Sequence, residues 1–205
     1  RNFGFAYAYK QNYDVLIKDK LDNSISKKIN SIKSDKKVLF IYDNKINKIL
    51  VDRLVKNLKE SGCFLIALEF QGNKKHKNEK SLLNLIDIMI DNKFSKKSIV
   101  ISFGGGVIGD LAALAASLYY RGTIYFNIPS TMTSIIDSCI GGKTGINYKN
   151  IINSVGNYYH PRTVFIFNDV IKLIPEREFI AGIPEILKCG LIKKNKILTI
   201  LKDKK

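Results

Sequence analysis

The chain has 205 residues, which is enough for one domain with a full hydrophobic core, or for one domain and a piece of another. Hydrophobic residues make up 45% and charged residues 25% of it, a balance typical of globular proteins that excludes a disordered or membrane-embedded chain. The formal net charge is +16, yet only five of the 34 basic residues are arginines, and the lysines are scattered. We therefore expect no nucleic-acid partner, and we expect the charge to attract small anionic ligands.

The cysteines and the N-terminal segment bear on location. Cys63, Cys139 and Cys189 are odd in number and form no CxxC pair, which favours a reducing cytoplasm over a disulfide framework. The N-terminal segment shows no apolar run long enough for a signal peptide or a membrane span, so no membrane association is expected. Because the sequence begins with Arg1 and not with methionine, we expect it to be part of a longer product.

The first half of the chain alternates between two kinds of pattern. Short apolar runs rich in β-branched residues predict strands, and longer segments with apolar residues at helical intervals predict helices. We expect strands at residues 13–17, 37–42 and 63–68, and helices at residues 21–32, 46–61 and 82–90. Strands that alternate with helices predict a parallel sheet covered by helices on both faces.

Asp43 directly follows the second predicted strand. An acidic residue in this place accepts hydrogen bonds from the adenosine ribose in other dinucleotide-binding folds. The alternative, a helix N-cap or turn residue, is the more common role of an aspartate there. Both interpretations place the Asp43 carboxylate at the carboxyl edge of the predicted sheet.

A glycine cluster follows the next predicted strand, at residues 98–101. It reads Gly104-Gly105-Gly106 and continues to Gly109-Asp110, ahead of an alanine- and leucine-rich helix at residues 111–118. A strand, a glycine turn and a helix in this order bring backbone N–H groups and a helix N-terminus close to a phosphate group. The spacing differs from GxGxxG, so a purely structural turn is the alternative.

A second glycine cluster, residues 137–145, reads DSCIGGKTG. It contains Gly-Lys-Thr, but Asp137 occupies the position of the first glycine of a Walker A loop, so a P-loop is disfavoured. A carboxylate at Asp137 and an ammonium at Lys143, on a loop that glycine lets approach a ligand, suit a polar anionic substrate better.

The remaining segments predict a change of architecture. Strands are expected at residues 124–128 and 164–167, and from Pro175 onward the pattern is helical, with Glu176 and Glu178 suited to a first turn. We expect a domain boundary at residues 173–175, which divides an α/β domain (1–174) from the start of a helical domain (175–205). Residues 193–205 are typical of an amphipathic helix that is cut short.

Several separated motifs occur in the order, and at nearly the spacing, found in 3-dehydroquinate synthases. They are 103–110 (FGGGVIGD), 120–122 (YRG), 128–131 (IPST), 137–147 (DSCIGGKTGIN) and 175–188, which runs from PERE to PEILK. The resemblance covers most of the chain and is strongest from Ser98 onward. It implies an α/β fold with a Rossmann-like doubly wound parallel sheet that binds NAD, followed by the first helices of an incomplete α-helical domain for metal and substrate.

The activity implied by this resemblance is that of a carbon–oxygen (phosphate) lyase of the shikimate pathway to chorismate and the aromatic amino acids. Its substrate is a phosphorylated keto acid, 3-deoxy-D-arabino-heptulosonate 7-phosphate, which becomes 3-dehydroquinate with release of phosphate. NAD is used catalytically, and a divalent metal, zinc or cobalt, is needed. The resemblance also implies a cytoplasmic homodimer. The alternatives are a related sugar-phosphate cyclase and a truncated, non-catalytic NAD-binding remnant.

The resemblance also implies roles for individual residues. Fixed cations, proton-handling groups and hydrogen-bond donors for the substrate are expected at Arg121, Asp137, Lys143, Asn153 and Lys188. NAD is expected to contact Gly105, Gly106, Val107, Gly109, Asp110, Ser130, Thr131 and Lys143. Glu185 is expected to be a metal ligand.

Three features depart from the family pattern. Ile152 stands where the family has a lysine, and an isoleucine cannot bind an anion by charge, although Lys149 lies nearby. In the segment at residues 72–80, Lys80 fits a nucleotide motif, but Lys77 stands where we expect its glutamate. The two histidines of the chain, His76 and His160, are not placed as the two histidine ligands that would complete a zinc site with Glu185.

Overall fold

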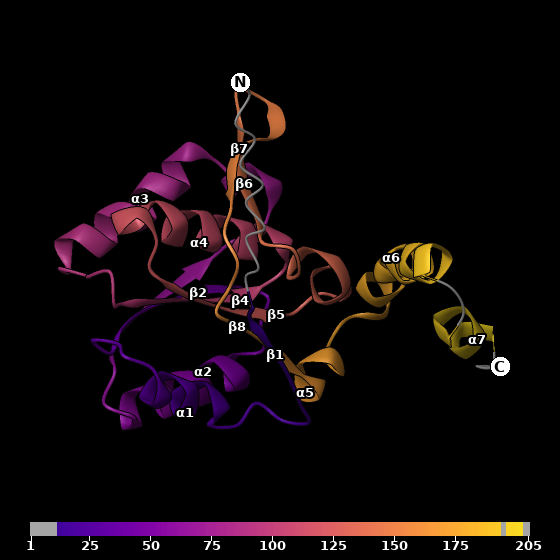
Figure 1. The fold of residues 1–205 in the computed structure, drawn as a ribbon, viewed down its shortest axis with the longest axis horizontal. Coiled ribbons are helices and arrows are strands. Elements are labelled where there is room, and N and C mark those ends of the chain that lie inside the picture. The colour runs from indigo at the N-terminus through magenta and orange to yellow at the C-terminus, as the bar shows by residue number, and fades with distance from the viewer. Residues whose placement is uncertain (1–11, 194–195, 203–205) are drawn as a thin grey trace, which may run out of the picture.

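The computed structural model describes residues 12–193 and 196–202, in which six strands form one sheet in the order β1-β8-β5-β4-β2-β3 (Figure 1). The strands are β1 (Asp14–Lys18), β2 (Lys37–Asp43), β3 (Phe64–Phe70), β4 (Ile99–Gly104), β5 (Ile124–Pro129) and β8 (Thr163–Phe167). Every pairing in this sheet is parallel. The predicted Rossmann-like parallel sheet is confirmed, and each predicted strand lies within a few residues of its expected place.

Two pairs of helices cover the two faces of the sheet. In Figure 1, α1 (Ser24–Ser31) and α2 (Lys48–Glu60) lie below it, and α3 (Glu79–Asp91) and α4 (Gly106–Leu118) lie above it. Successive side chains of a strand point to opposite faces. Accordingly, Leu39 of β2 belongs to the hydrophobic cluster between the sheet and helices α3 and α4. Its neighbour Phe40 belongs to the cluster between the sheet and helices α1 and α2.

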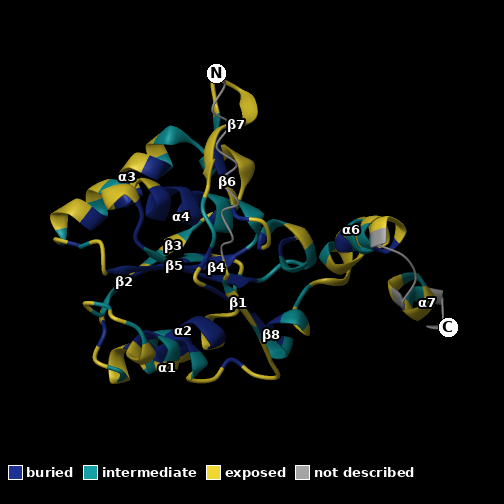
Figure 2. Ribbon diagram, in the orientation of Figure 1, coloured by how far each residue is buried: buried dark blue, intermediate teal, exposed yellow. Residues whose placement is uncertain are grey.

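The central strands are the most deeply buried part of the fold (Figure 2). All six residues of β4 are buried, as expected for a parallel strand with helices on both faces. Phe126 and Phe165, from the neighbouring strands β5 and β8, are fully buried and meet edge to face with their ring centroids 5.6 Å apart. Burial of each such ring stabilises the fold by about 1.5–3 kcal/mol. The strand ends that carry the glycine turn are therefore held on a rigid support.

A two-stranded antiparallel hairpin, β6 (Lys143–Tyr148) and β7 (Ile151–Tyr158), projects from the α3/α4 side of the molecule (Figure 1). We placed the glycine cluster at residues 137–145 on a loop and predicted no strand in residues 143–158, so this hairpin was missed. All eight residues of β7 are exposed (Figure 2), so the strand lacks the alternation of buried and exposed positions by which strands are recognised. Its turn at Lys149 and Asn150 has positive φ at both residues but contains no glycine, which hides the usual hairpin signal.

Three helices follow the last strand. They are α5 (Asn168–Ile171), α6 (Glu176–Lys193) and α7 (Lys196–Lys202), and α6 and α7 extend to one side of the sheet (Figure 1). Pro175 directly precedes α6, where its fixed φ and missing N–H do no harm to the helix. Within residues 12–193 and 196–202, every helix is too short or too polar to cross a bilayer.

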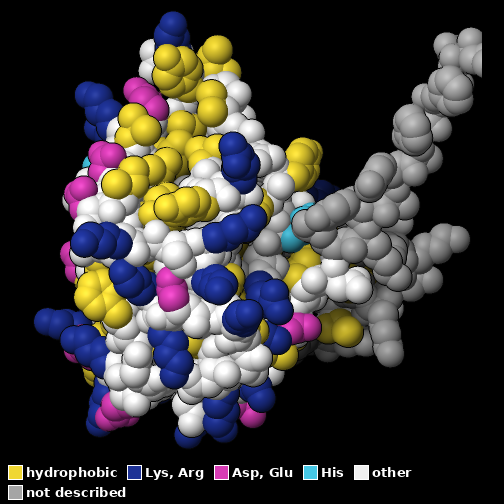
Figure 3. All heavy atoms as spheres, turned by 60° about the vertical axis from the view of Figure 1, so that its left-hand side comes forward, with side chains coloured by type: hydrophobic (Ala, Val, Ile, Leu, Met, Phe, Trp, Pro, Cys, Tyr) yellow, Lys and Arg dark blue, Asp and Glu magenta, His cyan; other side chains and the backbone are white. Residues whose placement is uncertain are grey.

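Basic side chains are spread over the face drawn in Figure 3, with acidic, apolar and neutral side chains between them. The positive charge of this face is therefore diffuse. Such a charge distribution raises the local concentration of anions without fixing the position of any one of them.

Candidate functional site

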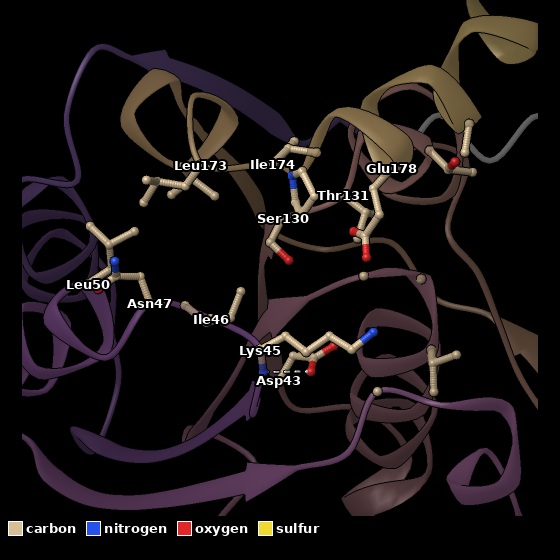
Figure 4. Close-up of a pocket in the computed structure, with 18 residues that line it drawn as sticks. Asp43, Lys45, Ile46, Asn47, Leu50, Ser130, Thr131, Leu173, Ile174 and Glu178 are labelled. Carbon is tan, nitrogen blue, oxygen red and sulfur yellow. Dashed lines mark hydrogen bonds between the residues drawn. The ribbon is translucent and has the colours of Figure 1, made fainter.

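The first candidate site lies at the carboxyl edge of the sheet, between the ends of β2 and β4. These strands are neighbours, but the helix that follows β2 lies on one face and the helix that follows β4 lies on the other. Such a topological switch point leaves a crevice in which doubly wound folds bind their ligands. Here it is a cavity of about 590 Å³ with Asp43 on one side and Glu178 on the other (Figure 4), and the glycine turn also lines it.

The glycine turn forms one wall of this cavity through Gly105, Gly106 and Val107. Gly105 is the N-cap of α4, and no side chain caps the helix there. The first backbone N–H groups of a helix have no partner within the helix, and they carry its partial positive charge. A Cβ atom on Gly105 would lie 3.0 Å from Thr131 Cγ2, so a larger residue would fill the space in front of these N–H groups. The turn therefore has the shape and polarity of a phosphate-binding site.

Asp43 lies at the opposite wall, as the last residue of β2. It is 7% exposed, and its Oδ1 accepts a hydrogen bond from the Lys45 backbone N–H at 3.1 Å. A Cβ atom on Gly72 would overlap the Asp43 carboxylate, so the missing side chain there lets the two segments meet. Asp43 thus stabilises a turn, as its role as a turn residue requires, and it also lines the cavity, as its role as a ribose acceptor requires (Figure 4).

Ser130 and Thr131 follow β5 and complete the floor of the cavity. Thr131 Oγ1 is 2.9 Å from Ser134 Oγ, which fixes the threonine hydroxyl within its own turn. Glu178, from the first turn of α6, points into the cavity from the side of the C-terminal helices (Figure 4). We had not predicted Glu178 as a site residue, because its place in a first helical turn already accounts for an acidic side chain.

A second cavity, of about 660 Å³, lies beside the hairpin. Four predicted residues from four elements line it: Asp110 of α4, Asp137 of the π-helical turn at Ser134–Ser138, Lys143 of β6 and Asn153 of β7. At the glycine turn, a residue that lines the first cavity lies beside a residue that lines the second. A Cβ atom on Gly106, which lines the first, would lie 3.1 Å from the Oγ of Ser138, which lines the second.

Lys77 enters this region from the loop before α3. Its ammonium lies 2.5 Å from Asp110 Oδ2 and 2.5 Å from Asn153 Oδ1. Burial raises the pKa of Asp110 above its ordinary value, and the Lys77 ammonium opposes part of that rise. Lys80, which we matched to the nucleotide motif, is exposed on α3. Asn78 caps α3, because its side chain accepts a hydrogen bond from the Ser81 N–H. An asparagine at this position in the sequence is a helix-start signal, and it places Lys77 before the helix and Lys80 within it.

Lys188 joins α6 to the second cavity. Its ammonium forms salt bridges with Glu185 Oε2, one turn earlier, and with Asp137 Oδ1 at 3.1 Å. Hydrogen bonds to Glu185 and Asp137 raise the pKa of Lys188. The Lys188 and Asp137 side chains are about half exposed, so this pair contributes little to stability, but it places the Lys188 charge beside Asp137.

The residues that the structure describes do not fit a zinc or cobalt centre. A catalytic zinc takes three protein ligands. Within residues 12–193 and 196–202, no group of three His, Cys, Asp or Glu side chains is placed to hold a metal ion. Glu185 is engaged with Lys188, His76 lies in the turn before α3, and His160 stacks on Tyr13 with the ring centroids 5.4 Å apart.

Four predicted residues are absent from the linings of both cavities: Glu185 and Lys188 of α6, described above, and Gly109 and Arg121. Gly109 is in α4, where a Cβ atom would approach the Asn127 side chain at 3.7 Å, so it serves the packing of α4 on β5. Arg121 follows α4 at its C-terminal end, three residues before β5 begins. Because α4 starts at the carboxyl edge of the sheet, Arg121 lies at the amino edge, away from Asp137 and Lys143 of the same chain.

The three cysteines differ in their expected reactivity. Burial raises the pKa of the Cys139 thiol to about 11, Asp137 adds to the rise, and burial also raises the pKa of Cys63. Cys189 is only partly buried. At pH 8 we expect iodoacetamide to alkylate Cys189 first, because it is the most accessible of the three, and Cys139 much more slowly, because it is buried and a thiol with a pKa of about 11 is almost entirely protonated at that pH. Peptide mass mapping over time checks this order, and equal rates for all three thiols would contradict it.

A parallel sheet with an uncapped helix N-terminus at its switch point is the architecture of the doubly wound, Rossmann-like α/β proteins. Residues 67–181 match the model of the 3-dehydroquinate synthase N-terminal family, and the chain belongs to this family. It is 33% identical over 195 residues to the 3-dehydroquinate synthase of Prochlorococcus marinus subsp. pastoris, covering 94% of this chain and 54% of the relative. For the enzyme of Clostridium tetani, the identity is 37% over 177 residues, covering 84% and 46%. The chain thus spans about half the length of the curated relatives it matches.

Solved structures of similar fold come from related cyclases. A 2-deoxy-scyllo-inosose synthase complexed with carbaglucose-6-phosphate, NAD⁺ and Co²⁺ matches with a TM-score of 0.79 and 25% identity, over 90% of this chain and 51% of that one. A 2-epi-5-epi-valiolone synthase from Streptomyces hygroscopicus, with NAD⁺ and Zn²⁺ bound, has the same TM-score and identity over 91% and 51%. A butanol dehydrogenase from Thermotoga maritima, at 16% identity and a TM-score of 0.69, shares the fold alone.

Proposed function

We propose that this chain is the NAD-binding part of a 3-dehydroquinate synthase, which converts 3-deoxy-D-arabino-heptulosonate 7-phosphate to 3-dehydroquinate and phosphate. The observation that supports this most directly is the proximity of the two cavities at the glycine turn, where Gly106 of the first lies beside Ser138 of the second. One cavity offers uncapped helix N–H groups to a dinucleotide, and the other offers a lysine, an amide and two carboxylates to a polar substrate. A hydride passes between cofactor and substrate only if their binding sites lie close together in this way.

The side chains of the second cavity suit a doubly anionic substrate. Lys143 and Lys188 supply positive charge for a phosphate or carboxylate, and Asn153 supplies hydrogen bonds. Asp137, held beside Lys188, can accept and return a proton at the substrate. NAD, when bound in the first cavity, would supply reversible oxidation of a substrate hydroxyl. The described residues offer Glu185 alone for a metal of the kind bound in the related cyclases, so the proposal for this chain rests on NAD and anion binding.

The second candidate function is that of a different sugar-phosphate cyclase, and the similarity to the inosose and valiolone synthases favours it. These enzymes share the fold and the NAD site, so the choice between the two functions depends on the substrate. Glu185 and Lys188 of α6 lie beside the second cavity whichever substrate it binds. These two side chains therefore do not distinguish the two functions.

The test measures NAD affinity by calorimetry and phosphate release by a coupled assay, with the protein in its longest natural form. We expect NAD-dependent phosphate release from the heptulosonate phosphate. Release from heptulose 7-phosphate, which has no carboxylate group, should be much slower. Faster release from the heptulose would favour the second candidate. NAD binding without release from either sugar would indicate a non-catalytic remnant, and no NAD binding would refute the proposal.

A further inference from the structure

Lys77 has an unusual environment for a lysine of this chain. Among the lysines that the structure describes, it alone is buried, with 6% of the residue exposed. A buried ammonium is stable only when it is paired and hydrogen-bonded. Its two partners, Asp110 and Asn153, both line the second cavity.

The Lys77 segment also holds the hairpin through its backbone. The Lys77 carbonyl accepts a hydrogen bond from the Asn147 N–H at 2.8 Å. Asn147 Oδ1 in turn accepts from the Asn153 N–H at 3.0 Å, which supports the left-handed φ of +53° at Asn153. The loop before α3, helix α4 and both strands of the hairpin thus meet at Lys77, with α4 and β7 at its ammonium and β6 at its backbone carbonyl. Within the hairpin, β6 is held on the α3/α4 side by the buried side chain of Ile146, whereas all of β7 is exposed, so the Asn153–Lys77 contact is important chiefly for the position of β7.

The charge at Lys77 bears on a departure of this sequence from its family. Ile152 stands where a lysine is expected, and it is 66% exposed. The Asn153 end of the second cavity therefore receives no cation from position 152. The Lys77 ammonium contacts Asn153 from the loop before α3 instead, and its charge there is paired with that of Asp110.

We propose that Lys77 is a positioning residue that holds the β6–β7 hairpin against α4 and so fixes Asn153 and Lys143 relative to the glycine turn. Its effect on turnover rests on the proposed function, whereas its effect on the hairpin does not. Without Lys77, Asp110 loses its opposite charge in a poorly hydrated place and Asn153 loses its anchor. The substrate site would then lose its shape while the cofactor site, which contains none of these residues, remains intact.

The first test uses the chain as it is. Hydrogen exchange followed by mass spectrometry compares Lys77→Met with Lys80→Met, which removes the same charge from the exposed face of α3 three residues later. In Lys77→Met we expect the amides of residues 143–158 to exchange at least about tenfold faster, with those of β4 and β5 unchanged. Equal hairpin exchange in the two variants would overturn the proposal.

A second variant keeps the test decisive if Lys77→Met fails to fold. Lys77→Met combined with Asp110→Asn leaves no unpaired buried charge, and we expect it to fold with the hairpin still exchanging about tenfold faster, because Asn153 has lost its anchor. Hairpin exchange at the wild-type rate in the double variant would also overturn the proposal.

The third measurement separates positioning from general stability. In the form that turns over, we expect Lys77→Met to raise the KM for the phosphorylated substrate about tenfold, a loss of about 1.4 kcal/mol, with the KM for NAD unchanged. An equal rise in both KM values would contradict positioning at the substrate side. If the hairpin loosens and even the wild-type protein releases no phosphate, the proposed function fails and the role of Lys77 in the hairpin stands.

Discussion

Gly105→Val is expected to weaken NAD binding at least about 100-fold, or about 2.7 kcal/mol, while the sheet stays folded. The backbone of Gly105 has φ −77° and ψ −173°, which valine adopts without strain. Its Cβ would meet Thr131 Cγ2 at 3.0 Å, and its methyl groups would occupy the cavity in front of the α4 N-terminus. A phosphate could then no longer reach the free N–H groups. Calorimetric titration with NAD, together with a thermal melt by circular dichroism, measures both quantities.

Gly62→Ala provides the matched control. Gly62 ends α2 with φ +79°, far along the chain from the glycine turn, and nothing lies within 4 Å of a Cβ atom there. An alanine in that conformation costs about 1 kcal/mol of stability and leaves NAD affinity unchanged. If Gly105→Val bound NAD as the wild type does, the first cavity would not be the cofactor site.

The sheet could be predicted from the sequence because its strands are buried on both faces. Residues 99–101 and 164–167 are continuous apolar runs bounded by polar residues, and such runs are typical of a parallel strand covered on both faces. The glycine turn was predictable for a related reason. Three consecutive glycines between a strand and a helix have few uses other than a close approach of the backbone to a neighbour or a ligand.

The second cavity could not be predicted in the same way. The exposed hairpin follows no hydrophobic period, so the pairing that brings Asn153 opposite Lys77 leaves no trace in the local sequence. That contact joins residues 76 positions apart, and only the folded chain reveals it. The position of Arg121 was hidden for a similar reason. The family motif shows that the residue is present, but the length and direction of α4 decide which edge of the sheet it reaches.

Gly156→Ala is expected to abolish phosphate release while NAD binding survives. Gly156 pairs with Gly145 across the hairpin, and a Cβ atom there would overlap the backbone carbonyl of Thr144. A backbone oxygen cannot move aside as a side chain can, so the two strands must separate. Lys143 and Asn153 would then leave the second cavity, and we expect release to fall at least about 100-fold. The parallel sheet should persist, because β7 buries none of its residues.

If the cavities have the roles proposed for them, Gly105→Val therefore lowers NAD affinity, whereas Gly156→Ala lowers phosphate release and leaves NAD affinity unchanged. Gly105→Val acts on the first cavity, to which the hairpin contributes no residue, and Gly156→Ala acts on the second. Val155→Ala, on the same exposed strand but outside the lining of the second cavity, shortens a side chain that is 43% exposed and should leave both NAD binding and release nearly unchanged. If Gly156→Ala lost NAD affinity as well, cofactor binding would depend on the hairpin. If it kept full phosphate release, the substrate would have to bind outside the second cavity.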